Sequence, residues 1–347
     1  MTNLYAGVAG YVGRADQRGI VGVFSRVAGS DSWSHVVKDH ECWAVSIHPT
    51  DPNVVFAGTA DGVYRSVDAG RTFARTDFPK DGIQIWSFLV DRTNPKVVYA
   101  GGSPITMYRS EDCGETWKKL PNPGMPDRAV MPFACRVMRM AQHPNKPGTI
   151  YGALEVNGVM RSDDHGETWT DVSKDLIRLA QQPHLKSKIV SNTYNEGMLD
   201  SHAIAISPSD PDGVVLAVRM GLFHTADAGE TWQDMEVGRF SPNTYGRDIQ
   251  VSPQDGNTMY AALSVAAASH EGGVFRTQDG GKSWKRFDKV KVHGTIMSVA
   301  LSRTDANKVY LGARYDGEVY GTEDGGATWS ACPLPAGVKD IYSLAVG

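Results

Sequence analysis

The stretch SVDAGRTF at residues 66–73 decides the fold, because five more copies of its pattern follow along the chain. The copies are SEDCGETW at 110–117, SDDHGETW at 162–169, TADAGETW at 225–232, TQDGGKSW at 277–284 and TEDGGATW at 322–329. In each copy the aspartate can accept hydrogen bonds from turn N–H groups, the glycine can adopt a positive φ, and the final aromatic residue can anchor the returning strand. These six segments, called the repeated turns below, are predicted to be one structural element used six times.

The spacing of the repeated turns predicts the architecture. They start 44, 52, 63, 52 and 45 residues apart, a period typical of a four-stranded propeller blade. Apolar runs at 43–47, 54–58 and 62–65 surround the first turn and are predicted to be three strands, with a fourth after the turn. The second of these strands recurs at 97–101, 149–153, 214–218, 258–262 and 309–312.

The two ends of the chain are predicted to share a seventh blade. Residues 4–7 resemble a second strand without a first, and residues 341–345 resemble a first strand without a second. We therefore expect an all-β, seven-bladed β-propeller of four-stranded antiparallel blades, closed by the C-terminal strand and forming one domain over 1–347. The turn of the first blade, near 28–33, keeps only a degenerate form of the pattern.

Composition narrows the classes of partner. The net charge of −4 and the lack of a basic run argue against nucleic acid, and no apolar stretch is long enough to cross a membrane. The four cysteines lie in different predicted blades without a CxxC spacing, which favours reduced thiols. A cytoplasmic location is predicted, with secretion as the alternative if a leader has been removed.

A propeller normally binds its ligand at one mouth of the central channel, so the aligned innermost strands give a list of candidate residues. Alignment on Trp43 places these residues on one ring: Trp86, Met138, His202, Arg247, Met297 and Tyr342. The residues two positions earlier are Glu41, Gln84, Arg136, Asp200, Tyr245, Thr295 and Asp340, and the following loops add Arg14, Asp61, Glu155, Arg219, His270, Glu271, Arg314, Tyr315 and Asp316. Divergence confined to this ring suggests a ligand site, although a wet channel mouth tolerates polar residues without any function.

Three chemistries fit these residues. A divalent metal ion would use His202 with Glu155, Asp200, His270 or His293. Metal-free acid–base hydrolysis would use two carboxylates, such as Glu155 with Asp200 or Glu41 with Asp340. An anion clamp would use Arg136, Arg219, Arg247 and Arg314 from different blades.

Other conspicuous groups have a structural interpretation. The aspartates of the repeated turns lie away from the expected mouth, and Arg65, Arg109, Arg161 and Arg276 share one strand position that suits ion pairs at the rim. Cys42 and Cys135 are weak candidates for a nucleophile. The long segment 170–200 contains a predicted helix at 174–182, which either covers the mouth or fills a gap between blades.

The repeated turns resemble the Asp-box, or BNR repeat, of a propeller superfamily that includes sialidases, xyloglucan-active hydrolases, sortilin-type receptors and photosystem II assembly factors. The resemblance covers nearly the whole chain and is greatest to single-ring bacterial proteins described as BNR-repeat or glycosyl-hydrolase-like. It implies a propeller with a ligand site at the channel mouth. The motif specifies the fold far better than the activity.

Taken together, these patterns predict a hydrolase- or lyase-like enzyme that acts on a small polar, carbohydrate-like or anionic substrate. His202, Asp200 and Glu155 are the predicted catalytic residues, and His202, Glu155, His270 and His293 would hold the metal. The predicted substrate-binding residues are Arg136, Arg219, Arg247, Arg314, Tyr245, Trp43, Trp86, Tyr315 and Tyr342. The alternative is a non-catalytic scaffold that binds a protein or peptide across the same face, with these aromatic residues and Tyr194 as anchors.

Overall fold

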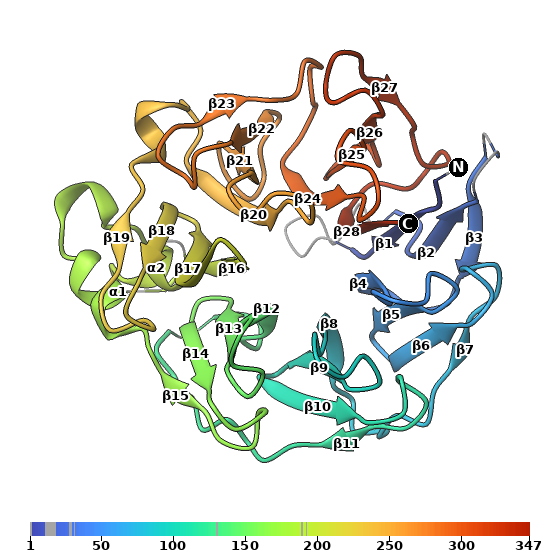
Figure 1. The fold of residues 1–347 in the computed structure, drawn as a ribbon, viewed down its shortest axis with the longest axis horizontal. Coiled ribbons are helices and arrows are strands. Elements are labelled where there is room, and N and C mark those ends of the chain that lie inside the picture. The colour runs from blue at the N-terminus through green and yellow to red at the C-terminus, as the bar shows by residue number, and fades with distance from the viewer. Residues whose placement is uncertain are drawn as a thin grey trace.

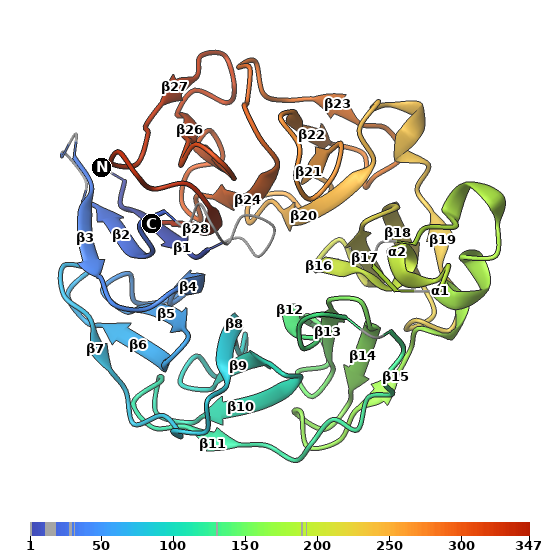
Figure 2. The ribbon, with the colours of Figure 1, turned by 180° about the vertical axis from the view of Figure 1, so that it is seen from behind.

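The chain folds into seven four-stranded antiparallel sheets arranged as blades around a central channel (Figures 1 and 2). The computed structural model describes residues 2–10, 19–27, 30, 32–129, 131–188, 190–191 and 193–347. The predicted seven-bladed β-propeller is confirmed.

The blades follow one another in chain order, except that the first blade takes its innermost strand from the C-terminus. Blade 1 contains β28 (Ile341–Val346), β1 (Leu4–Val8), β2 (Gly22–Arg26) and β3 (Ser34–Val37). Blade 2 contains β4 (Cys42–Ile47), β5 (Val55–Thr59), β6 (Gly62–Ser66) and β7 (Ala74–Arg75), and blade 3 contains β8 (Gln84–Val90), β9 (Val98–Ser103), β10 (Thr106–Ser110) and β11 (Lys118–Lys119). Blade 4 contains β12 (Val137–Gln142), β13 (Ile150–Leu154), β14 (Gly158–Ser162) and β15 (Thr170–Asp171). Blade 5 contains β16 (Ser201–Ser207), β17 (Asp210–Val218), β18 (Gly221–Thr225) and β19 (Gln233–Asp234). Blade 6 contains β20 (Tyr245–Val251), β21 (Met259–Ser264), β22 (Gly272–Thr277) and β23 (Lys285–Arg286), and blade 7 contains β24 (Ile296–Leu301), β25 (Val309–Ala313), β26 (Val319–Thr322) and β27 (Ser330–Ala331).

The ring closes through the two ends of the chain, as predicted. Strand β28 pairs with β1 in antiparallel register, with Leu4 opposite Val346. Each innermost strand also contacts the innermost strands of both neighbouring blades. This closure removes the exposed sheet edge that an open array of blades would leave at the channel.

The repeated turns have the predicted hydrogen bonds. In the first turn, Asp68 Oδ1 accepts bonds from the Thr72 N–H at 2.9 Å and from the Ser66 hydroxyl at 2.7 Å, while Gly70 N–H donates to Ser66 Oγ at 2.9 Å. Gly70 has the expected positive φ of 75°, and Ala69 before it also has a positive φ, of 58°. The turn therefore uses two consecutive left-handed residues, one more than the sequence pattern indicated.

The core lies between neighbouring blades and is anchored by the aromatic residues of the repeated turns. Trp117, Trp232 and Trp284 each pack in a different buried cluster that joins two adjacent blades. At the rim, Arg65 pairs with Glu115 at 3.5 Å and Arg109 with Glu167 at 2.8 Å, which also links adjacent blades.

The long segment after β15 fills the gap between blades 4 and 5. It contains α1 (Lys174–Leu179), η2 (Pro183–Leu185) and α2 (Glu196–Leu199), and a further short helix, η3 (Val237–Arg239), follows β19. Leu176, Leu179 and Met198 are buried in one cluster with Trp232, whose indole N–H donates to the Val172 carbonyl at 3.2 Å. Of the two predictions for this segment, the structure therefore favours a plug between blades over a lid. No helix in the described residues is long and apolar enough to span a membrane.

Candidate functional site

Each innermost strand contains a β-bulge, and the bulges line up around the channel. Pairing with the second strand skips one residue in every blade. The skipped residues are Trp43, Trp86, Met138, His202, Arg247, Met297 and Tyr342, which are the members of the ring predicted from the sequence. A bulge redirects its side chain out of the regular alternation, and bulges are common beside functional sites.

Five of these bulge residues close the channel at this level. Trp43, Trp86, Met138, Met297 and Tyr342 form one buried cluster with Ala9. The indole rings of Trp43 and Trp86 are stacked, with centroids 4.9 Å apart, and Tyr342 meets Trp86 edge-on at 5.8 Å. The channel is thus divided into a half near the predicted mouth and a half near the opposite face.

The predicted catalytic residues converge between blades 4 and 5. Glu155, Asp200 and His202 each place one potential ligand atom within 4.8 Å of the other two. Glu155 follows β13, and its backbone N–H bonds to the Arg136 carbonyl at 3.0 Å. Asp200 directly follows α2, and His202 is the bulge residue of β16, so the end of the plug and the bulge position two side chains of the set.

The hydrogen bonds of His202 fix one of its protons. Its Nδ1 lies 2.7 Å from the Gly246 carbonyl oxygen, so Nδ1 must carry hydrogen. Its Nε2 lies 3.3 Å from the Tyr245 hydroxyl and 3.2 Å from Asp200 Oδ1. Among the described residues, Asp200 Oδ1 has no donor of good hydrogen-bond geometry, and Nε2 is its near neighbour. Nε2 and Oδ1 therefore face a common point that a proton or a cation would stabilise.

Two arginines balance the carboxylates of this set. Arg136 Nε lies 2.5 Å from Glu155 Oε2, and Arg219 Nε lies 3.3 Å from Asp200 Oδ2. Burial on its own raises the pKa of Asp200, but His202, Arg219 and Arg247 outweigh burial and lower this pKa to about 2. Asp200 is therefore ionised at neutral pH and cannot be a general acid there.

An aromatic pocket of about 400 Å³ adjoins this set on the mouth side. Its walls include Glu41, Trp43, Gln84, Trp86, Phe133, Arg136 and Tyr342. The Arg136 guanidinium lies over the Trp86 ring at 4.0 Å and over the Phe133 ring at 4.5 Å. Phe133 was missed in the sequence because it lies in the irregular loop before β12, where the repeat gives no alignment.

The other predicted arginines also reach the mouth. Arg247 is 7% exposed, and no ion pair joins it to a carboxylate of the described residues. Arg314 lies over the Tyr342 ring at 4.9 Å and donates to the Ala267 carbonyl at 2.8 Å. Tyr245 borders Arg219, and burial raises the pKa of its hydroxyl to about 12.

Several predicted residues lie away from the set. His270 packs against Tyr315 in a separate pocket between blades 6 and 7, and exposed His293 lies 3.7 Å from Glu318. The structure therefore corrects the predicted metal set, because neither histidine joins Glu155, Asp200 and His202. Arg14 lies outside the described residues.

The cysteines near this face do not have reactive thiols. Burial raises the pKa of Cys42 to about 12 and that of Cys135 to about 11. Both thiols are therefore protonated at neutral pH and are poor nucleophiles.

Comparison with known proteins gives partial sequence matches. No family model matches the chain. It is 27% identical over 183 residues to a xyloglucanase from Hypocrea jecorina, covering 53% of this chain and 18% of that protein. It is 25% identical over 222 residues to xyloglucanase Xgh74A from Acetivibrio thermocellus, covering 56% of this chain and 24% of that protein. The chain thus matches less than a quarter of the length of these curated relatives.

Comparison with solved structures supports the fold. A GH74 enzyme from Niastella koreensis superposes with a TM-score of 0.63 at 14% identity, covering 94% of this chain and 46% of that one. A structure described as YCF48 bound to D1 peptide superposes with a TM-score of 0.51 at 14% identity, covering 84% and 80% of the two chains. At this level of identity the two structures show a shared propeller fold alone.

Proposed function

We propose that this protein is a hydrolase-like enzyme that binds a small polar, carbohydrate-like substrate in the aromatic pocket, with Glu155, Asp200 and His202 as the reactive groups. The observation that carries the proposal is the position of Arg136. Its guanidinium forms a wall of the aromatic pocket and also contacts the Glu155 carboxylate. A substrate in the pocket would therefore lie beside the carboxylate–imidazole set. The partial similarity to xyloglucanases supports a carbohydrate as the substrate class.

The lining of the aromatic pocket suits a sugar. The rings of Trp43, Trp86 and Tyr342 offer apolar surface for the C–H face of a pyranose, and Glu41 and Gln84 offer hydrogen bonds to its hydroxyl groups. The volume of about 400 Å³ lies within the range of about 300–1,000 Å³ that is typical of small-molecule sites.

The reactive set has the donors of a divalent cation site. The 3.2 Å between His202 Nε2 and Asp200 Oδ1 is close to the ~3.3 Å that separates two ligands of a tetrahedral ion with bonds of about 2.0–2.1 Å. The bond from Nδ1 to the Gly246 carbonyl has the form that orients metal-bound histidines. A cation bound here would lower the pKa of a coordinated water toward neutrality. Arg136 and Arg219 would hold the two carboxylates in place.

Metal-free acid–base chemistry is the second way in which the set can act. Because Asp200 stays ionised, His202 or Glu155 would have to be the proton donor. In that case His202 Nε2 carries a proton that Asp200 stabilises, and no cation is needed.

Metal content and hydrolysis distinguish these two mechanisms. Elemental mass spectrometry measures the bound metal in wild type, His202→Ala, Glu155→Ala and the matched control His293→Ala. We expect near-stoichiometric metal in wild type and the control, and loss of metal in the two site variants.

A panel of xyloglucan oligosaccharides, chromogenic glycosides, esters and lactones is then assayed with and without chelator. Hydrolysis that is lost in Glu155→Ala but insensitive to chelator indicates acid–base catalysis, and no hydrolysis of any class contradicts the proposal.

The alternative of a peptide-binding scaffold is favoured by a different observation, the four arginines that blades 4 to 7 bring to the mouth. Arg247 and Arg219 lie close enough to Asp200 to lower its pKa, and a peptide carboxylate could bind to the same cations. The fold is shared with a protein described as bound to a peptide. Affinity capture with wild type and Arg247→Gln tests this alternative, which requires a specific partner that the variant loses.

We also infer that the repeated turns are Asp-boxes of the BNR type. In each turn the first hydroxyl donates to the aspartate and accepts from the glycine N–H, which supports this assignment. The test is a turn-grafting experiment, in which the turn of a known BNR propeller replaces residues 225–232 without loss of folding.

A further inference from the structure

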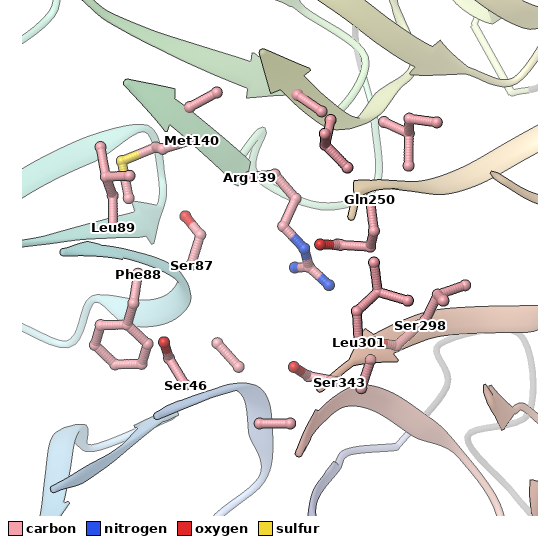
Figure 3. A pocket seen from close by; sticks show the side chains of 18 of the residues that line it. Ser46, Ser87, Phe88, Leu89, Arg139, Met140, Gln250, Ser298, Leu301 and Ser343 are labelled. Carbon is pink, nitrogen blue, oxygen red and sulfur yellow. The ribbon is translucent and has the colours of Figure 1, made fainter. Parts of the chain in front are cut away.

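The half of the channel away from the mouth contains a second cavity, of about 360 Å³. All seven innermost strands line it with the residues that follow their bulges. The Arg139 guanidinium extends into its centre, and Gln250, Ser298 and Ser343 surround the space (Figure 3). The buried bulge residues lie between this cavity and the aromatic pocket, so the two are separate sites.

Arg139 occupies a position that has a structural role in other blades. The residue directly after the bulge bonds the next blade in four cases: Ser87 donates to the Val137 carbonyl, and Asp248, Ser298 and Ser343 accept from the N–H groups of Val299, Leu344 and Val45. Arg139 makes no such bond between blades. Its Nη1 instead donates to the carbonyl of the preceding Met138 at 2.8 Å. Blade 4 therefore has a cation in the channel at the position where four other blades form a hydrogen bond to the next blade.

Two further arginines at the opening of this cavity also depart from the repeat. The turn after the innermost strand has proline in blades 2, 4, 5 and 6, at Pro49, Pro144, Pro208 and Pro253. Blades 3 and 7 have Arg92 and Arg303 instead, and both line the cavity. These substitutions are readable in the sequence once the blades are aligned.

The three guanidinium groups lack an ion-paired carboxylate among the described residues. No ion pair joins Arg92, Arg139 or Arg303 to an acidic side chain in the described part of the chain. Asp248 acts on Arg139 only at longer range, and both of its oxygens accept other hydrogen bonds. Desolvation lowers the pKa of Arg139, which lies inside the channel, whereas Arg92 and Arg303 at the opening are exposed to solvent.

We propose that this cavity, called the arginine channel, binds a small oxyanion that carries more than one negative charge, such as a phosphate group. Guanidinium groups bind phosphate and carboxylate oxygens through paired hydrogen bonds. Neutral donors from Gln250, Ser298 and the other serines can complete the coordination. A bound oxyanion supplies beside Arg139 the ion-pair partner that the described residues do not provide, with Arg92 and Arg303 at the opening of the same cavity.

Calorimetric titration with inorganic phosphate and pyrophosphate in low-chloride buffer tests the proposal. Arg139→Ser places in blade 4 the residue that three other blades have at this position, so the variant is compatible with the repeat. Wild type is expected to bind one equivalent, and Arg139→Ser to bind at least tenfold more weakly. Lys282→Ser removes an exposed charge from a repeated turn and is expected to bind as wild type does.

Two more variants locate the anion and keep the test decisive. Arg303→Pro reproduces the turn of the other blades and is expected to weaken binding, whereas Arg136→Gln in the aromatic pocket is expected to leave it unchanged. Loss of binding in Arg136→Gln with retention in Arg139→Ser would place the anion at the mouth and overturn the proposal. Equal binding by wild type and Arg139→Ser, or no saturable binding by wild type, would also overturn it. Thermal melts must show the same pattern, with phosphate raising the Tm of wild type but not that of Arg139→Ser.

Discussion

Every blade runs from the central channel to the outer rim. The blades are largely alike in sequence at the rim and differ from one another at the channel. At the rim, the repeated turns keep the same residue types and the same hydrogen bonds, as in the bonds of Asp68 and Asp227 to a threonine N–H at 2.9 Å. In the channel, the bulge keeps its backbone geometry in all seven blades while its side chain ranges from Trp43 to His202 and Arg247. The hydrogen bonds of the repeated turn form within one turn, so every blade that has this turn needs the same residue types there. The bulge side chains face the channel, where blades can differ without loss of these turn bonds, and such divergence is expected where a repeat protein binds a ligand.

The largest expected effect tests whether the rim aromatics stabilise the fold by burial. Trp232→Ala should lower the free energy of unfolding by about 3–5 kcal/mol, because Trp232 is 2% exposed and packs against the plug between blades 4 and 5. Trp329→Ala is the matched control, because Trp329 has the same place in its turn but is only half-buried. Its loss should be less than half as large in urea denaturation. Equal losses would show that the turn, rather than burial, determines the contribution.

The second prediction concerns charge in the channel compared with charge at the rim. Asp200→Asn should lower the free energy of unfolding by about 2 kcal/mol in chelator-treated protein, because it leaves Arg219 and His202 without their carboxylate in a buried site. Asp163→Asn at the rim should cost below about 1 kcal/mol, since the Asp163 side chain is exposed to water and its partner Arg161 is only half-buried. Urea denaturation of both variants measures the difference, and a larger loss in Asp163→Asn would contradict this interpretation.

The third prediction is a pH dependence that arises at the rim. The hydroxyl of Thr231 and that of Ser283, with further turn bonds, lower the pKa of Asp227 and of Asp279 to about 2. These values are below the pKa of about 3.9 in an unfolded chain, so the ionised aspartates stabilise the fold above about pH 4. That contribution should be lost as the pH falls from about 4 toward 2.

The measurement for this prediction is Tm as a function of pH. The double variant Asp227→Asn, Asp279→Asn should show a shallower decline in Tm between about pH 4 and 2 than wild type does. An unchanged slope would assign the acid sensitivity to other carboxylates with a pKa of about 2, such as Asp68 and Asp324 in the repeated turns or Asp200 in the channel.

The smallest expected effect concerns the backbone of the repeated turns. Ala69 and Ala228 have positive φ values of 58° and 63°, whereas the turns of blades 6 and 7 have Gly280 and Gly325 at the same position. Ala228→Gly should therefore raise the free energy of unfolding by a few tenths to about 1 kcal/mol. Ala262→Gly, in the middle of β21, is the control and should lower it by about 1 kcal/mol. Destabilisation by Ala228→Gly would show that the unfolded chain gains more entropy than the turn gains in relief of strain.

Much of the site could be predicted once the fold was known, because each blade repeats the same topology. The alignment on Trp43 gave the seven bulge residues, and it placed Asp200 two residues before His202. Glu155 joined them because the loop after the second strand lies on the same face. His270 and His293 were wrongly included in the metal set, because the alignment predicts which face of the ring a residue lies on but not how many blades separate two residues on that face.

The arginine channel was missed for a different reason. Arg92, Arg139 and Arg303 lie beyond the bulges, outside the ring of residues that the alignment gave as site candidates. The sequence does show Arg92 and Arg303 at a turn position where four other blades have proline. Their relevance to binding becomes clear only from the cavity that the structure shows in this half of the channel.

The sequence by itself determined the number of blades, their strand order and the closure of the ring, because the repeated turns impose local hydrogen bonds that need no distant partner. Only the tertiary structure decided that the segment 170–200 is a plug, that Arg136 borders both the aromatic pocket and Glu155, and that Arg139 stands in an open cavity. These features depend on distances between side chains of different blades. Such distances are set by how seven sheets pack around one axis, and no single repeat encodes them.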